Sequence, residues 1–297
     1  MLLLVGDNPF HGISHLSQHR SRERGTLLSQ TEYAAKLVTT SLENGADGFM
    51  FTVSETTLSI VEAIRKKGIE DLKLFALVPY AYEYVRLATQ LGGVSGLAKK
   101  LAREIVLSMN VKPLFIGMKG LVRTDIEALL ETYLYYEIYR IRSSAGKHAN
   151  LACLVLHELV TEMALALDLD WLFRSYIGFM INLGIMPGFE TRNFAYLVKK
   201  FEAWRIDFHK TIIVAPFNKL GFQMNPSKTD CEKALARLPV PNVVAMSILA
   251  AGYIRAPEAV EYVRTLPNLR GVVVGVSKER HARETFATLR TRLKQDH

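Results

Sequence analysis

The sequence predicts an α/β protein, a (β/α)8 TIM barrel with a helical insertion after strand 3, on three observations. Short, β-rich apolar runs alternate with helical runs along the chain. Eight of these runs are apolar almost throughout, which is typical of parallel strands buried on both faces. The chain has 297 residues, whereas a barrel needs roughly 250, which leaves room for an insertion.

The expected strands are separated by helices with ordinary start and stop signals. Gly45 and Gly68 follow the first two helices as expected C-caps, and Pro257 opens a later helix at its first turn. No G-x-G-x-x-G fingerprint follows the first strand, which favours the barrel over a doubly wound open sheet, the alternative fold. The strands are expected at residues 2–6, 48–53, 72–78, 151–156, 185–189, 211–215, 243–249 and 271–276.

The alternation breaks between residues 81 and 148, where the pattern is almost all helical. A short apolar run at 114–118 lies among helical patterns at 82–91, 97–109 and 125–142. We therefore divide the chain into barrel strands 1–3 over residues 1–80, a helical insertion over 81–148, and barrel strands 4–8 over 149–297.

The insertion carries a stripe of tyrosines on its last helix, at Tyr133, Tyr135, Tyr136 and Tyr139. Side chains three or four residues apart share a helix face, so the stripe indicates core packing or a contact between subunits of a homo-oligomer. Because the insertion follows strand 3, we expect it to emerge on the catalytic face, where it could serve as a lid.

Composition excludes several classes of protein. Apolar residues make up 49% of the chain and charged residues 22%, which excludes intrinsic disorder. The two cysteines, Cys153 and Cys231, are too few for a disulfide scaffold or a four-cysteine zinc site.

The net charge of +8 raises the question of a nucleic-acid partner. The basic residues are mostly scattered, and pairs such as Lys66-Lys67 fall at the ends of helical patterns, where cations suit the helix dipole. We therefore expect a basic surface or a small anionic ligand, and no nucleic acid. The most apolar stretch, 176–189, is shorter than the about 20 residues that span a bilayer. With no recognisable signal peptide, we expect a cytoplasmic protein without a membrane partner.

A barrel carries its active site at the C-terminal ends of its strands, so the strand map predicts where the chemistry lies. Asp7 and His11 follow the first strand, and His157 and Glu158 follow the fourth. Together these four side chains could form an acid–base set or bind a divalent metal.

Two further histidines, His15 and His19, continue the four-residue spacing that begins at His11. Two histidines four residues apart on a helix can bind zinc. Pro9 and Gly12 disfavour a helix here, so we interpret His15 and His19 as surface-loop residues.

Lys219, just beyond the sixth strand, offers a different chemistry. Phe217, Leu220 and Phe222 surround it in sequence. A lysine that they desolvate would have a lowered pKa and could form a Schiff base with a carbonyl compound. The alternative is an exposed loop lysine. Glu190 and Glu55 are further carboxylates at strand ends, and each by itself is typical of a cap or a salt bridge.

The end of the eighth strand predicts an anion site. Gly275, Ser277, Lys278 and Arg280 lead from that strand into the last helix. Free N–H groups at a helix N-terminus bind phosphate, and the two cations add charge. The alternative is that Ser277 is simply the N-cap of that helix.

In this stretch the sequence resembles the aldo-keto reductase superfamily. Residues 271–284, GVVVGVSKERHARE, are similar to its last strand and to the helix that holds the adenosine phosphate of the nicotinamide cofactor. Residues 244–252, which include Ser247, are similar to its seventh strand and following loop, and residues 45–55 resemble its second βα unit in outline. The resemblance implies a barrel, NADP as a cofactor, and cofactor-binding roles for Gly275, Ser277, Lys278, Arg280 and Ser247.

The catalytic residues of that family are largely missing here. It uses an Asp and a Tyr after strand two, a Lys at strand three and a His at strand four. In this chain the Asp position falls near Phe51, strand three ends in Leu77-Val78-Pro79, and only His157 matches. The resemblance therefore implies the fold and a phosphate site, and not ordinary carbonyl reduction.

Three hypotheses on function follow. The first is an enzyme that acts on a small carbonyl or an anionic, phosphorylated substrate, with His157, His11 and Asp7 transferring protons. The second is a Schiff-base lyase or aldolase that uses Lys219. The third is a non-catalytic barrel that acts through its helical insertion.

Overall fold

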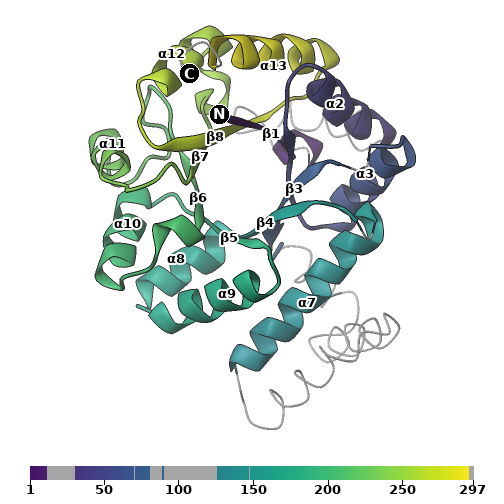
Figure 1. Cartoon of the computed structure of the whole chain (residues 1–297). Helices are drawn as coiled ribbons and strands as arrows, with labels where there is room; N and C mark the ends of the chain where they lie inside the picture. Colours follow the sequence, from purple (N-terminus) through teal and green to yellow (C-terminus); the bar gives the residue numbers. More distant parts are fainter. Residues whose placement is uncertain (12–30, 70, 81–88, 90–125, 147, 294–297) are drawn as a thin grey trace.

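A computed structural model of the chain describes residues 1–11, 31–69, 71–80, 89, 126–146 and 148–293 (Figure 1). Eight parallel strands pair in chain order into a closed barrel, in which β8 pairs back onto β1. The predicted (β/α)8 TIM barrel is confirmed. The strands are β1 (Leu2–Gly6), β2 (Gly48–Thr52), β3 (Lys73–Val78), β4 (Leu151–Leu156), β5 (Met186–Glu190), β6 (Ile212–Pro216), β7 (Val243–Met246) and β8 (Leu269–Gly275).

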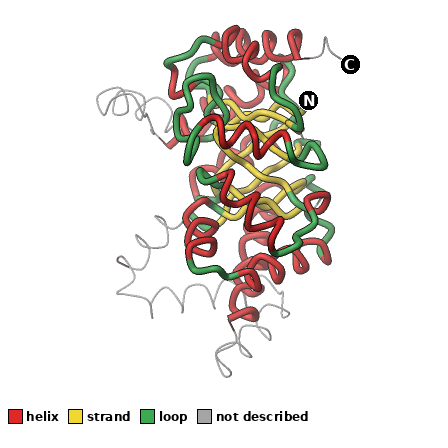
Figure 2. The backbone as a smooth tube through the Cα atoms, turned by 90° about the vertical axis from the view of Figure 1, so that its left-hand side faces the viewer, coloured by secondary structure: helices red, strands yellow, loops and turns green. Residues whose placement is uncertain are grey.

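Helices surround the barrel, and Figure 2 shows them outside the tilted strands. They bury one apolar face against the strands and leave charged side chains outside, as α3 does with Leu58, Val61 and Ile64. None of the helices described is long and apolar enough to cross a membrane. The α-helices are α2 (Thr31–Glu43), α3 (Glu55–Lys66), α7 (Ile126–Ala145), α8 (Glu158–Ala166), α9 (Asp170–Asn182), α10 (Phe194–Ala203), α11 (Lys228–Ala236), α12 (Ala256–Arg264) and α13 (Glu279–Leu293).

The inside of the barrel is filled by apolar side chains that form a cluster separate from the core between strands and helices. Its members include Met50, Cys153, Val155, Met186 and Val214. Because side chains alternate across a strand, the residues two positions further along face the same interior. The strands therefore place Thr52, His157 and Glu190 next above this cluster, at the C-terminal mouth of the barrel.

The helix α7 belongs to the outer ring of helices. It packs against α3 and α9 (Figure 1). Tyr135 meets Phe179 of α9 edge-on at 4.9 Å between ring centroids, and Tyr136 is buried. These contacts agree with the core-packing interpretation of the tyrosine stripe, so part of the range 81–148 serves as an ordinary barrel helix. The predicted helices at 82–91 and 97–109 and the apolar run at 114–118 lie outside the described residues, apart from residue 89.

Most strand boundaries differ from the sequence expectation by one or two residues, and the larger differences have a local cause. The seventh strand ends at Met246, because Ser247 adopts a left-handed conformation with φ 55°. The segment between the fourth and fifth strands forms two helices, α8 and α9, with Asp168 at φ 56° between them. The last helix begins at Glu279, and Lys278 provides the carbonyl that accepts from the N–H of Ala282, so Ser277 is not its N-cap.

Closure of the barrel depends on a glycine in β8. A Cβ atom built on Gly271 would lie 2.5 Å from the carbonyl oxygen of Leu2 and 2.7 Å from its Cβ, in the paired strand β1. Backbone in a paired strand cannot move aside without loss of the pairing. We expect Gly271→Ala to lower the free energy of unfolding by about 1–3 kcal/mol, as measured by urea denaturation.

The matched control is Gly178→Ala in α9. A Cβ atom at Gly178 meets nothing within 4 Å, and alanine favours a helix over glycine by roughly 0.5–1 kcal/mol. This variant should be at least as stable as the wild type. Equal stabilities of the two variants would contradict the role given to Gly271.

Candidate functional site

The candidate site lies at the C-terminal mouth of the barrel, where the loops after β1, β4, β5 and β6 converge. His157 is the residue before α8, and its Nδ1 accepts a hydrogen bond from the N–H of Leu159 at 3.2 Å. A nitrogen that accepts has no proton, so Nε2 carries it in the neutral ring. Burial lowers the pKa of His157, which favours this neutral form. The Nε2 atom lies 4.0 Å from Oε2 of Glu190.

Glu190 ends β5 and is 8% exposed. The same oxygen, Oε2, accepts a hydrogen bond from the N–H of Glu158 at 3.2 Å. Burial, followed by the negative charge of Glu158, raises the pKa of Glu190 from its usual 4.5 to about 7. Glu190 is therefore able to give or take a proton near neutral pH, beyond the cap or salt bridge expected for it from the sequence.

Asp7 and His11 form a second pair at the same mouth, as expected from the sequence. Nε2 of His11 lies 3.0 Å from Oδ2 of Asp7, and both side chains are largely buried. The same Oδ2 accepts from the N–H of Thr52 at 2.7 Å, which ties the end of β1 to the end of β2. The ring of His11 lies 5.5 Å from that of Tyr80, which follows β3. The negative charge of Asp7 raises the pKa of both His157 and Glu190, so the two pairs act on each other electrostatically.

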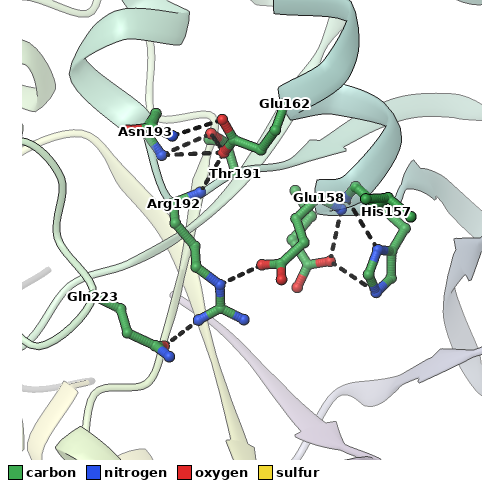
Figure 3. Close-up of polar contacts among 9 residues, drawn as sticks. His157, Glu158, Glu162, Thr191, Arg192, Asn193 and Gln223 are labelled. Atoms are coloured by element: carbon green, nitrogen blue, oxygen red, sulfur yellow. Dashed lines mark hydrogen bonds and ion pairs between the residues drawn. The ribbon is translucent and has the colours of Figure 1, made fainter. Parts of the chain in front are cut away.

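Arg192, two residues beyond Glu190, projects between Glu158 at the start of α8 and Gln223 on the loop after β6 (Figure 3). Its Nε donates to the carboxylate of Glu158, and its Nη1 donates to the side-chain oxygen of Gln223. Glu158 is thus the partner of an arginine. Among the charged groups that affect the pKa of His157 and Glu190, Arg192 is the one cation that the described part of the chain provides.

A single carboxylate, that of Glu162 on α8, holds the backbone that carries Arg192 (Figure 3). Its Oε1 accepts from the hydroxyl of Thr191 at 2.7 Å and from the N–H groups of Arg192 at 2.9 Å and Asn193 at 3.3 Å. Its Oε2 accepts from the side-chain amide of Asn193 at 2.7 Å. The carboxylate also satisfies donors at the start of α10, where a negative charge suits the helix dipole.

The sequence assigned no role to Glu162, Arg192, Gln223 or Tyr80. Glu162 lies one helical turn after Glu158, so both face the neighbouring loop after β5. That spacing was the signal available in the sequence. The spacing of Glu158 and Glu162 indicates a shared role only once the structure shows that the loop between β5 and α10 lies beside α8.

The residues expected to bind a phosphate lie at the surface after β8. Lys278 and Arg280 are exposed and Ser277 is half-buried, at the start of α13. Arg280 pairs with Glu284 at 3.2 Å on the same helix. A Cβ atom at Gly275 would lie 2.8 Å from Cδ of Pro9, so this glycine is explained by the close approach of the loop after β1.

Ser247 directly follows β7 in a left-handed conformation, and Ala250 and Ala251 share that conformation nearby. Three such residues without glycine in one short loop are costly, and strained backbone of this kind concentrates at functional sites. The cofactor-binding role that the resemblance implies for Ser247 stays a prediction.

Lys219 does not have the environment that a Schiff-base lysine needs. Its side chain is 55% exposed, and its Nζ lies 2.6 Å from Oε1 of Glu258 on α12. Phe217 is buried, but it does not desolvate the amine, because the lysine side chain extends to the neighbouring helix. The premise of the lyase hypothesis was wrong, and the alternative of an exposed loop lysine describes the residue.

The expected metal site at Asp7, His11, His157 and Glu158 is not assembled. In the described ranges, no three His, Cys, Asp or Glu side chains are placed so that they could hold a metal ion. The reason lies in their partners, because Glu158 binds Arg192 whereas Oδ2 of Asp7 faces His11 and the backbone of Thr52. His15 and His19 lie outside the described residues.

Comparisons with known proteins support the fold. No protein-family model matches the chain, and no relative is found among curated proteins. Two solved structures from Pseudomonas aeruginosa, each described as a "putative aldo-keto reductase", are similar to it with a TM-score of 0.56, at 11% and 12% sequence identity. Each alignment covers 98% of this chain and 90% of the other. The resemblance to aldo-keto reductases is therefore confirmed at the level of the barrel.

Proposed function

We propose that this chain is an oxidoreductase of the aldo-keto reductase type with a divergent active site, in which Glu190 is the proton donor to a small carbonyl substrate. One observation carries the proposal: Glu190 is a buried carboxyl group at the mouth of the barrel, 4.0 Å from Nε2 of His157, and its pKa is about 7. The fold shared with the two Pseudomonas structures supports the reaction class. Glu190 would serve as the proton donor in place of the family's Tyr and Lys, which the sequence lacks at the ends of strands two and three.

Glu190 and His157 have different roles in the proposed acid–base catalysis. Glu190 in its protonated form gives its proton to the oxygen of the carbonyl group as that oxygen becomes an alcohol, and it is left as a carboxylate. His157 stays neutral, because burial lowers its pKa and its Nδ1 accepts a hydrogen bond from the N–H of Leu159. Its Nε2–H can therefore donate a hydrogen bond to the developing negative charge, on the substrate oxygen or on Glu190. In the oxidation of an alcohol the same groups act in reverse.

The donor set after β8 fits the phosphate of a nicotinamide nucleotide. A serine hydroxyl and two cations, from Ser277, Lys278 and Arg280, lie at the N-terminal end of a helix of 15 residues. These three side chains would hold the phosphate, while Pro9 occupies the space beside Gly275. When bound, NADPH supplies the hydride for the carbonyl carbon.

The proposal predicts activity that depends on Glu190. Purified protein should oxidise NADPH in the presence of a panel of small aldehydes and ketones. Glu190→Gln should lower kcat by roughly 10²- to 10⁴-fold, because the amide cannot donate the acidic proton. In the wild type, kcat for reduction should fall as the pH rises through about 7, since the protonated form of Glu190 is lost.

The matched control is Glu202→Gln on the exposed surface of α10, which should keep the wild-type kcat. Lys278→Gln combined with Arg280→Gln should weaken NADPH binding, as followed by nucleotide fluorescence. Absence of NADPH binding by the wild type, or full activity of the Glu190→Gln protein, would refute the proposal.

The raised pKa of Glu190 also predicts how stability depends on pH. A carboxyl group whose pKa is higher in the folded state than in the unfolded state binds more protons when folded. Its contribution to stability is therefore present below the unfolded value of 4.5 and is lost as the pH rises through about 7. Between about pH 5 and about pH 8, the wild type should lose up to about 3 kcal/mol of unfolding free energy relative to Glu190→Gln.

Urea denaturation of both proteins at the two pH values measures this difference. The Glu202→Gln protein, which alters an exposed carboxylate, should follow the wild type at both. If the wild type and the Glu190→Gln protein respond to pH in parallel, then Glu190 does not titrate in this range.

A further inference from the structure

We infer that Arg192 binds the carboxylate of the substrate, so that the substrate is a small oxo acid or the matching hydroxy acid. The inference rests on the proposed function for the carbonyl chemistry, but the binding site itself stands on the contacts of Arg192. Those contacts fix the arginine at its backbone and its side chain, and leave one edge of its guanidinium group available.

The carboxylate of Glu162 holds the backbone of Arg192 in place. Glu162 receives four hydrogen bonds from residues 191–193, and one of them comes from the N–H of Arg192 itself. Since Glu162 lies on α8, directly after β4, the loop after β5 is tied to the neighbouring βα unit. The position of the Cα atom of Arg192 is thereby set before any ligand arrives, which lowers the entropy cost of binding.

The side chain of Arg192 is held from two sides. Glu158 accepts from its Nε and Gln223 accepts from its Nη1. These partners lie at the start of α8 and on the loop after β6 (Figure 3). Gln223 has a left-handed backbone, with φ 62°, which marks its placement as constrained. Across the described residues, Nη2 of Arg192 has no hydrogen-bond partner. The side chain remains 29% exposed, so a ligand at the mouth can reach this edge.

The guanidinium group lies close enough to the proposed acid–base groups to share a substrate with them. Arg192 is two residues beyond Glu190, and Glu158 links the two side chains: its carboxylate accepts from Nε of Arg192, and its N–H donates to Oε2 of Glu190 at 3.2 Å. The charge of Arg192 opposes the rise in the pKa of Glu190 and adds to the lowering of the pKa of His157. A small molecule with a carbonyl and a charged end can therefore face the acid–base pair with one group and Arg192 with the other.

The surrounding charges favour a carboxylate over a phosphate. The planar guanidinium fork matches a carboxylate in shape and forms short, charge-assisted hydrogen bonds with it. Asp7, Glu158 and Glu190 surround the same mouth, and a dianionic phosphate would meet more repulsion from them than a carboxylate with one charge. A carboxylate held near Glu190 also favours its protonated form, which is the form that donates a proton. Binding of the acid and retention of this proton therefore support each other.

The test compares two probes of the same size and carbon skeleton, 2-oxobutanoate with its charged carboxylate and 2-oxobutanamide with an uncharged amide in its place. Their binding to the full chain is measured by calorimetry at millimolar concentrations, with and without NADP⁺, which has no hydride to give and so allows no turnover of the probe. The acid should bind at least about tenfold more tightly than the amide, which corresponds to about 1.4 kcal/mol. Arg192→Gln should remove this preference, and Arg192→Lys should restore it in part, because a lysine keeps the charge without the fork.

Two further measurements distinguish binding of the substrate carboxylate by Arg192 from a purely structural role of this residue. Arg237→Gln, which removes an exposed arginine paired with Glu202, should leave the affinity for 2-oxobutanoate unchanged. The affinity of the wild type should fall as the pH rises through about 7, and Glu190→Gln should bind the acid without that pH dependence.

The inference is overturned if the acid does not bind, if the amide binds as tightly, or if Arg192→Gln keeps the preference for the acid. A failure of the proposed function looks different. In that case NADPH is neither bound nor oxidised, while the Arg192-dependent preference for 2-oxobutanoate is still measured.

Discussion

The pairing of β1 with β8 is the constraint on which the rest of the structure depends. These strands are the first and last of the sheet, and their five paired positions run from Leu2–Gly271 to Gly6–Gly275. Glycine at the two ends of this register in β8 lets β1 and the loop after it approach closely, with Leu2 against Gly271 and Pro9 against Gly275. Once the sheet is closed, all eight strands end at one mouth, and residues far apart in the chain become neighbours.

The described residues at the mouth include more carboxyl groups than cations, and this excess of acidic groups determines the chemistry of the site. The charges of Glu158 and Asp7 raise the pKa of Glu190, and Arg192 offsets part of this effect. Glu190 is buried at the end of β5, and this burial, together with the nearby charge of Glu158, raises its pKa to about 7, so its proton is retained towards neutral pH. Burial of this carboxyl group lowers the free energy of unfolding at neutral pH. Ionisable groups with a strongly shifted pKa are characteristic of functional sites. Acid–base chemistry at Glu190 and anion binding at Arg192 are two consequences of one arrangement.

The sequence predicted the barrel well and the site in part. Apolar runs such as 2–6 and 151–156 matched β1 and β4, because a strand buried on both faces needs apolar residues at every position. Asp7, His11 and His157 were placed at the mouth correctly, since a residue that follows a parallel strand must lie there. Lys219 satisfied the same rule, yet its side chain turns to Glu258, because strand position does not determine side-chain direction in a loop.

The sequence by itself determined the fold class, the order of its strands and the edge of the barrel that carries polar residues, because periodicity and local signals are properties of neighbouring residues. Only the tertiary structure decided which of those residues act together. Glu162 beneath the loop of Arg192, Glu158 beside Arg192, and the environment that raises the pKa of Glu190 all depend on contacts between residues about 30 positions apart. Charge pairing and burial are set by distance in space, and spacing along the chain does not encode that distance until the barrel has closed.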